Sequence, residues 1–370
     1  MKFLCGALFY LICDLSQYNL VRAENKKNQA PQIQVSDLEN YLFNQNDSGV
    51  RRGPRTDAIV IFQDGKVIYE KYDRGYDSKK LHIVWSVSKT VTALMYGVAH
   101  QLGLYQLDQS VCDFDEFPRP EQCQIKVRDL LAWTTAIDWN EEYENALVAR
   151  NSSVLAMLYG EGRQDMAQFV KNHKFTKGEL PGKVWRYSSG DSLLAARLLQ
   201  KIFKTNDLRA QFKSQFFDKI GVTEWLWESD SVGTLVGSSH FYISASGLVK
   251  IGQLILNEGE INGKQLIGKD FLQFMKTVPS VYKTNRKDQK KWTVPGASIW
   301  LNDPQDGSNS VPWPGVPKDA IAALGHWGQY LLVIPSLKVV AVRFGDTRDG
   351  SIDIETLAKK IVEYLHANQK

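Results

Sequence analysis

A serine and a lysine, three residues apart, stand at the start of a predicted helix. The stretch Val84-Trp85-Ser86-Val87-Ser88-Lys89-Thr90 precedes apolar residues with helical spacing, and Gly103 predicts the end of that helix. Ser86 is therefore expected at the mouth of that helix, with Lys89 one turn later on the same face. The backbone N–H groups and dipole of a helix start favour negative charge, and a lysine in a partly dry pocket can lose its proton. The pattern predicts a nucleophilic serine beside a lysine base.

The Ser-x-x-Lys pattern alone is weak, because both residues are common. A second match, Ser280 to Lys283, follows Pro279 and opens no apolar helix. The interpretation of Ser86 therefore depends on other motifs in the chain.

Composition excludes several classes of function. The 370 residues are 43% hydrophobic and include ten tryptophans, enough for one large domain or two intimately packed subdomains. Basic and acidic residues nearly balance, 45 against 41, without a long basic run, so nucleic-acid binding is not indicated. The six histidines are scattered rather than clustered, which disfavours a metallohydrolase. We expect neither a metal site nor a cofactor.

The first 23 residues have the pattern of a secretory signal peptide. A basic start precedes an apolar stretch, residues 3–13, that is too short to span a bilayer, and cleavage is expected after Ala23. We therefore predict an exported protein, periplasmic or secreted, without a stable membrane anchor; an uncleaved anchor is the alternative. Cleavage leaves Cys112 and Cys123, which predict a disulfide, with two separate buried thiols as the alternative.

The remaining chain divides into a polar lead-in at 24–50, with a short helix at 35–43, and one domain at 51–370. Strand patterns occur early and late in the domain, and a closing helix follows the last of them. The part between them, about 105–240, is mostly helical in pattern. We predict an α/β (α+β) fold: an antiparallel sheet built from both termini and flanked by helices, with an inserted, mainly helical subdomain. The strand patterns lie at 58–62, 67–69, 330–334 and 339–344, and helix patterns at 127–133, 165–172, 192–203, 248–255 and 354–365.

A second group of chemically useful residues, Trp185-Arg186-Tyr187-Ser188-Ser189, precedes one of these helices. A tyrosine near a Ser/Lys pair can relay a proton once cationic neighbours lower its pKa. Ser189 is a candidate for hydrogen bonding to substrate. An ordinary helix N-cap explains the same serines, and the two interpretations are compatible.

A third group, Leu324-Gly325-His326-Trp327-Gly328-Gln329, enters the last hairpin. Glycine at a strand start allows a ligand to approach the backbone closely. The N–H group of Gln329 is then a candidate second oxyanion donor beside that of Ser86. His326 by itself is more often a structural polar residue than a catalytic one.

Together the three groups resemble the signature of the serine β-lactamase and penicillin-binding-protein superfamily, in its class C-like and esterase-like branch. That signature runs Ser-x-x-Lys, then Tyr-x-Asn or Tyr-x-Ser, then Lys-Thr-Gly or His-x-Gly. The surrounding sequence, over about 55–365, resembles the subgroup that contains 6-aminohexanoate-dimer hydrolase. The resembling segments are 58–65, 125–138, 157–160, 187–191, 236–239, 317–320 and 325–329.

The resemblance implies that Ser86 attacks a carbonyl, that Lys89 and Tyr187 move its proton, and that water releases the acyl group. The N–H groups of Ser86 and Gln329 would hold the oxyanion. The implied substrate-binding set has one further member, Tyr159, on a mobile loop, with core packing as the alternative. The complete set is Ser189, His326, Gly328, Tyr159 and Trp327.

The chain departs from the family signature at two motifs. Ser189 replaces the asparagine of class C β-lactamases, and His326-Trp327 replaces Lys-Thr, whose lysine usually helps to bind a substrate carboxylate. The loss of that lysine weakens the case for efficient β-lactam hydrolysis. Each of the three motifs has a tryptophan next to it or within it: Trp85, Trp185 and Trp327. These side chains are predicted either to line a partly aromatic cleft or simply to pack in the hydrophobic core.

An α/β-hydrolase is disfavoured because the chain has no Gly-x-Ser-x-Gly elbow. We predict an exported serine hydrolase that cleaves an ester or amide bond of a small-molecule or peptide-like substrate. The alternatives are a penicillin-binding or sensor protein that is acylated with little turnover, and a β-lactamase or D-Ala-D-Ala carboxypeptidase.

Overall fold

The computed structural model describes residues 36–44, 53–114, 117, 119–144, 151–282, 293–303 and 311–368. The expected signal peptide, most of the lead-in and Lys283 lie outside these residues, so the cleavage site and the domain boundaries stay predictions. Among the helices in the described ranges, none has the length and apolar character needed to cross a membrane.

The predicted antiparallel sheet from both ends of the chain is confirmed. Seven strands pair in the order β2-β1-β12-β11-β10-β9-β8, and every neighbouring pair is antiparallel. The early strand β1 therefore lies directly against β12, near the end of the chain. The strands are β1 (Thr56–Gln63), β2 (Lys66–Tyr72), β8 (Val294–Pro295), β9 (Trp300–Leu301), β10 (Ile321–Gly325), β11 (Gln329–Ile334) and β12 (Val339–Gly345).

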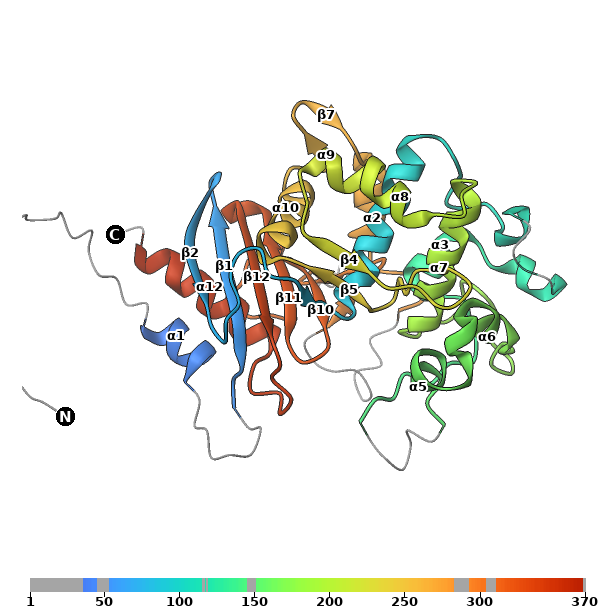
Figure 1. The fold of residues 1–370 in the computed structure, drawn as a ribbon, viewed down its shortest axis with the longest axis horizontal. Helices are drawn as coiled ribbons and strands as arrows, with labels where there is room; N and C mark the ends of the chain where they lie inside the picture. Colours follow the sequence, from blue (N-terminus) through green and yellow to red (C-terminus); the bar gives the residue numbers. More distant parts are fainter. Residues whose placement is uncertain are drawn as a thin grey trace, which may run out of the picture.

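Helices cover both faces of this sheet, as Figure 1 shows. Side chains alternate along a strand, so Ile59 and Ile61 of β1 face one cluster of buried residues while Ala58 and Val60 face the other. The first cluster includes apolar side chains of α1 (Ser36–Phe43) and α12 (Ile354–Asn368). The second, larger cluster includes those of α2 (Val87–Gln101) and α10 (Ala245–Leu256). Because both faces are covered, β1 is buried almost throughout and its central residues, 58–62, are all apolar.

Helix α2 joins the sheet to the mainly helical part of the molecule, as Figure 1 shows. Its residues 87–99 are all buried, between the β10–β11 side of the sheet and the helical middle. The remaining helices are α3 (Val127–Ala132), α5 (Ser153–Tyr159), α6 (Met166–Asn172), α7 (Ser189–Ile202), α8 (Leu208–Phe212), α9 (Asp218–Ile220) and α11 (Lys269–Met275). The remaining strands are β3 (His82–Ile83), β4 (Trp225–Trp227) and β5 (Phe241–Ile243), which form one sheet, and the hairpin β6 (Glu260–Ile261) with β7 (Lys264–Gln265).

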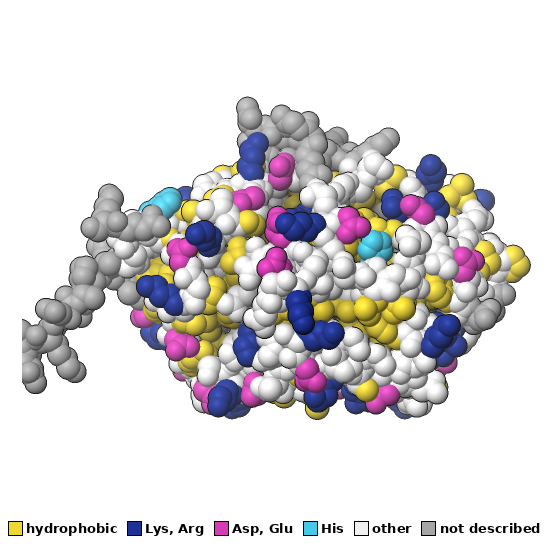
Figure 2. Space-filling model, turned by 90° about the horizontal axis from the view of Figure 1, so that it is seen from above, with side chains coloured by type: hydrophobic (Ala, Val, Ile, Leu, Met, Phe, Trp, Pro, Cys, Tyr) yellow, Lys and Arg dark blue, Asp and Glu magenta, His cyan; other side chains and the backbone are white. Residues whose placement is uncertain are grey.

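The predicted disulfide is confirmed. Cys112 and Cys123 are bonded and lie in two short 3-10 turns of the helical part. On the surface, Lys and Arg side chains are interspersed with Asp and Glu on the face that Figure 2 shows, with apolar side chains between them.

Candidate active site

Ser86 occupies the N-cap position of α2, as the sequence predicts. The residue before it, Trp85, has a φ of +47°, a left-handed conformation that is uncommon for a bulky residue. Strained residues of this kind are concentrated at functional sites, because the surrounding structure must hold them. An N-cap serine usually accepts a bond from a helix N–H. The Ser86 hydroxyl instead accepts a bond from the side chain of Lys89.

Lys89 is almost completely buried, with 2% of its surface exposed. Its Nζ donates to Ser86 Oγ at 2.9 Å and to the carbonyl oxygen of Ser238 at 2.8 Å. Burial disfavours the ammonium form and lowers the pKa of Lys89 to about 8, although the negative charge of Glu141 opposes this shift. About a tenth of Lys89 is therefore a neutral amine at pH 7, next to the serine hydroxyl, and the neutral share rises to about half at pH 8.

Tyr187 completes the group, at the end of the loop before α7. The Lys89 ammonium lies 5.0 Å from the centre of its ring, and the phenol hydrogen-bonds with the Ser86 side chain. Trp133 packs edge-on against the same ring, and Trp300 stacks on it. The expectation that cationic neighbours lower the Tyr187 pKa is wrong. Burial and then the charge of Glu141 raise that pKa, so Tyr187 is a neutral phenol.

Ser189 is buried in the first turn of α7, where its hydroxyl donates to Glu141 at 2.5 Å. The neighbouring Ser188 is the N-cap and accepts the N–H bond of Asp191, so the cap interpretation holds for Ser188. Glu141 was not among the residues singled out from the sequence. It stands in the described segment 141–144, which has neither helix nor strand periodicity and belongs to none of the three motifs.

The third motif forms the turn between β10 and β11. Trp327 and Gly328 both have positive φ, +58° and +87°. The position of a Cβ on Gly325 lies 2.2 Å from the carbonyl oxygen of Val84, so this end of β10 touches the backbone just before Ser86. Only glycine permits that approach, which brings the turn next to the start of α2.

The Gln329 side chain ties the turn to β12. Its amide nitrogen donates to the carbonyl oxygens of His326, at 3.1 Å, and Gly345, at 2.5 Å. Its amide oxygen accepts the N–H of Gly345 at 3.0 Å. Gln329, whose backbone N–H is the predicted second oxyanion donor, is therefore held in place through both the nitrogen and the oxygen of its side-chain amide.

Arg343, in β12, is the second residue that sequence reasoning missed. It is completely buried, and its guanidinium donates to the Gly328 carbonyl oxygen at 2.6 Å. The other bonds run to the Thr347 hydroxyl, the Arg55 carbonyl and the Thr56 hydroxyl. Burial lowers the Arg343 pKa to about 10, so it is still a cation at neutral pH. One buried charge thus connects the third motif with β1 and with the chain after β12.

His326 and Trp327 share one acceptor, the carboxylate of Glu144. His326 Nε2 lies 3.1 Å from Glu144 Oε1, and the Trp327 indole N–H donates to the same oxygen at 3.1 Å. Both rings lie edge-on to Trp85, with centroids 6.2 and 5.6 Å away. Trp85 and Trp327, like Trp185, are half-buried rather than part of the fully buried core.

Tyr159 stands at the end of α5 and is 54% exposed, so core packing does not explain it. Its hydroxyl lies 3.3 Å from His240 Nε2, and the His240 ring in turn packs edge-on to Trp85. Among the interactions of the described residues, none joins Tyr159 to the side chain of Ser86 or Lys89. Its part in substrate binding stays a prediction.

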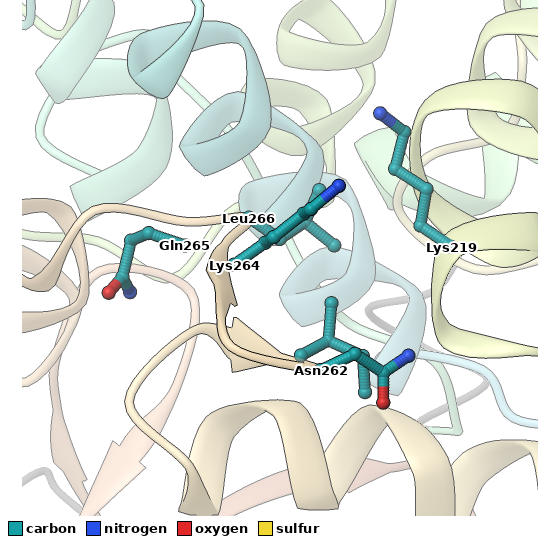
Figure 3. A pocket seen from close by; sticks show the side chains of 6 residues that line it. Lys219, Asn262, Lys264, Gln265 and Leu266 are labelled. Carbon is teal, nitrogen blue, oxygen red and sulfur yellow. The ribbon is translucent and has the colours of Figure 1, made fainter.

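The described residues contain no group of three or more His, Cys, Asp or Glu side chains placed to hold a metal ion. A hollow of about 420 Å³ lies between α9 and the β6–β7 hairpin (Figure 3). Its lining contains none of the motif residues; it consists of Lys219, Ile261, Asn262, Lys264, Gln265 and Leu266.

Comparisons with known proteins agree with this geometry. The model of the Beta-lactamase family matches residues 44–356. An uncharacterized protein of Alkalihalophilus pseudofirmus is 23% identical over 341 residues, which cover 83% of this chain and 90% of that protein.

Two solved structures have the same fold. A provisionally named 6-aminohexanoate-dimer hydrolase from Bacillus anthracis is similar at a TM-score of 0.69 and 20% identity, covering 85% of this chain and 80% of its own. A penicillin-binding-protein homologue from Caulobacter crescentus has a TM-score of 0.64 and 14% identity, covering 90% and 96%.

Proposed function

The chain belongs to the Beta-lactamase family, and on that premise we propose that it is an exported serine hydrolase that cleaves an ester or amide bond through an acyl-enzyme on Ser86. The family supports a serine hydrolase or acylating protein in general. The observation that carries the finer proposal is the 2.9 Å contact between a buried lysine amine and a serine hydroxyl at a helix start.

Acylation begins when Ser86 Oγ attacks the substrate carbonyl carbon and neutral Lys89 takes the hydroxyl proton. The oxyanion of the tetrahedral intermediate accepts bonds from the N–H groups of Ser86 and Gln329. Tyr187, as a neutral phenol, donates its proton to the leaving oxygen or nitrogen and regains one from the Lys89 ammonium. The bond to the leaving group breaks, and Ser86 carries the acyl group as an ester.

Deacylation follows the same path with water as the nucleophile. Water gives a proton to Lys89, attacks the ester carbon, and releases the acid while Ser86 Oγ is reprotonated. Both half-reactions use the same donors, because the acyl carbonyl occupies the same position in each.

The third motif favours esters or amides over substrates that need a cation for their carboxylate. At this motif His326 pairs with a carboxylate, that of Glu144, and Trp327 donates to the same group. A substrate carboxylate placed there would meet a like charge, which disfavours binding. This supports the ester or amide proposal over efficient β-lactam hydrolysis.

Intact mass of the protein, wild type beside Ser86→Ala, tests the reaction. Each protein is incubated with a short-chain activated ester and, separately, with a cephalosporin, while released product is followed. We expect steady ester turnover that disappears in Ser86→Ala, with no loss of cephalosporin. Turnover in the variant equal to that of wild type would show that Ser86 is not the nucleophile. A long-lived cephalosporin adduct without turnover would identify a penicillin-binding or sensor protein instead.

Roles for Lys89 and Tyr187 are tested in the same assay. Lys89→Ala and Tyr187→Phe should each lower turnover about hundredfold or more, because each removes a proton-transfer group. Near-normal turnover in either variant would contradict the role given to that residue.

Export is proposed from the sequence of residues 1–23. The protein recovered from the periplasm or the medium should begin close to Glu24 by N-terminal sequencing. A mature protein in the cytoplasm that retains these residues would contradict the proposal.

A further inference from the structure

The carboxylate of Glu141 is the acceptor for donors from two segments beside the catalytic group. The Ser189 backbone N–H donates to it at 2.9 Å and the Ser189 hydroxyl at 2.5 Å. The Trp139 indole N–H donates at 2.5 Å, and the Tyr143 hydroxyl also donates. A carboxylate accepts through two oxygens with several lone pairs, so it can receive all of these bonds at once. An amide cannot, because half of it is a donor.

This carboxylate also acts on the two proton-transfer groups. Its charge works against the burial that lowers the Lys89 pKa, and it adds to the burial that raises the Tyr187 pKa. The titratable or charged groups that face this cluster come from four elements: Lys89 from α2, Tyr187 from the loop before α7, Glu141 with Tyr143 from the 139–143 segment, and His326 from the β10–β11 turn, whose ring lies 5.1 Å from that of Tyr143. Glu141 is therefore the one anion among the described groups that bear on both Lys89 and Tyr187.

We propose that Glu141 is a positioning residue for the reaction. It fixes the second motif through Ser189, and its charge makes Lys89 the stronger base and keeps Tyr187 a neutral acid. This inference rests on the proposed function. Its geometric part follows from the bonds that hold Ser189, two residues after Tyr187, against the 139–143 segment. Its electrostatic part follows because a nearby anion stabilises an ammonium and destabilises a phenolate.

The pH dependence of kcat/KM with p-nitrophenyl acetate tests this proposal in the full chain, with product followed at a pH-independent wavelength. An activated ester needs little help from an acid, so its acid limb reports the base, Lys89. Glu141→Gln removes the charge, and the midpoint of the acid limb should fall by about half a pH unit or more. The plateau should fall about tenfold to hundredfold, because the second motif is no longer held in place.

Glu141→Asp separates the effect of the charge from the effect of side-chain length. It retains the anion on a shorter side chain, so the plateau should fall while the midpoint stays within about half a unit of wild type. Glu142→Gln is the matched control, since it removes one charge from the adjacent residue, whose side chain accepts bonds from the backbone N–H groups of Tyr143 and Glu144. Its profile should equal that of wild type.

Each outcome is decisive. A lowered plateau with an unmoved midpoint in Glu141→Gln would reduce Glu141 to a structural residue and overturn the proposal. The same midpoint shift in Glu142→Gln would also overturn it, because the effect would then be a general one of surface charge. If Glu141→Gln fails to fold, a midpoint shifted downward in Glu141→Asp, which keeps the charge, overturns the proposal, and an unshifted one supports it. Absence of Ser86-dependent turnover in wild type would instead refute the proposed function.

Discussion

Substitution of Gly328 by alanine should damage both the stability and the activity of this protein. Gly328 has a φ of +87°, and a Cβ there would lie 2.1 Å from Nη1 of Arg343, well inside the 3.4 Å of ordinary contact. The guanidinium would have to retreat and lose its 2.6 Å bond to the Gly328 carbonyl oxygen. The left-handed backbone costs alanine about 1 kcal/mol, and the lost bond to a buried charge about 1.5–3 kcal/mol more.

Gly65 provides a matched control in the β1–β2 turn. Its φ is +85°, almost the same, but nothing lies within 4 Å of the position of its Cβ. Gly65→Ala should therefore lose only the backbone contribution of about 1 kcal/mol, and its turnover should be unchanged. The difference between the two variants isolates the contact with Arg343.

Urea unfolding and Ser86-dependent ester turnover measure the two effects. Gly328→Ala should be about 2 kcal/mol less stable than Gly65→Ala. Its kcat should fall about a hundredfold, because a moved turn displaces the N–H of Gln329. Equal unfolding free energies and equal turnover in the two variants would refute the view that Arg343 fixes this turn.

Three other predictions follow from buried or bonded groups. Because the neutral amine of Lys89 is the active form, kcat/KM for ester hydrolysis should rise with pH with a midpoint near 8; a flat profile between about pH 6 and 9 would contradict this base assignment. Reducing the Cys112–Cys123 bond, which closes a loop of sequence separation 11, should lower the free energy of unfolding by about 2–3 kcal/mol in urea titrations, and an unchanged value would show that the loop is held by other contacts. Burial raises the Asp191 pKa to about 7 from 3.8, so the folded state holds a proton that the unfolded state has lost, and the free energy of unfolding falls as pH rises through that range. Urea titrations of Asp191→Asn should show a smaller fall in the free energy of unfolding over the same pH range. A fall equal to that of wild type would exclude Asp191 as its source.

Local periodicity was sufficient to predict where Ser86 and Lys89 lie. A helix that begins at residue 86 places residue 89 one turn later whatever surrounds it, and the apolar run after it indicates burial. The sheet was equally accessible, because β1 and β12 each have a long apolar strand pattern and lie far apart in the chain. Pairing the two ends of the chain was the simplest way to bury both strands.

The interactions that adjust the site were not accessible in the same way. Glu141 acts on Ser189 across 48 residues of sequence, and no spacing rule connects an irregular segment with a helix start that far away. The error about the Tyr187 pKa arose because neither the complete burial of the phenol, which is the larger cause, nor the carboxylate of Glu141 was foreseen. The sequence contained one signal for Arg343, because it is a charged residue within the apolar run of β12. That run was interpreted only as a strand.

The bonds of Arg343 also determine when, during synthesis, the site can be completed. Ser86, Lys89 and Tyr187 leave the ribosome early, but the Gly328 turn is held by a guanidinium that emerges later and binds Arg55, 288 residues before it. Strand β12 pairs locally with β11 and, across a very large sequence separation, with β1, and a pairing of the second kind forms slowly. A nascent or truncated chain that lacks β12 therefore carries Ser86, the proposed nucleophile, without a fixed turn at Gly328. The proposed hydrolysis accordingly requires a strand that is made long after the catalytic serine.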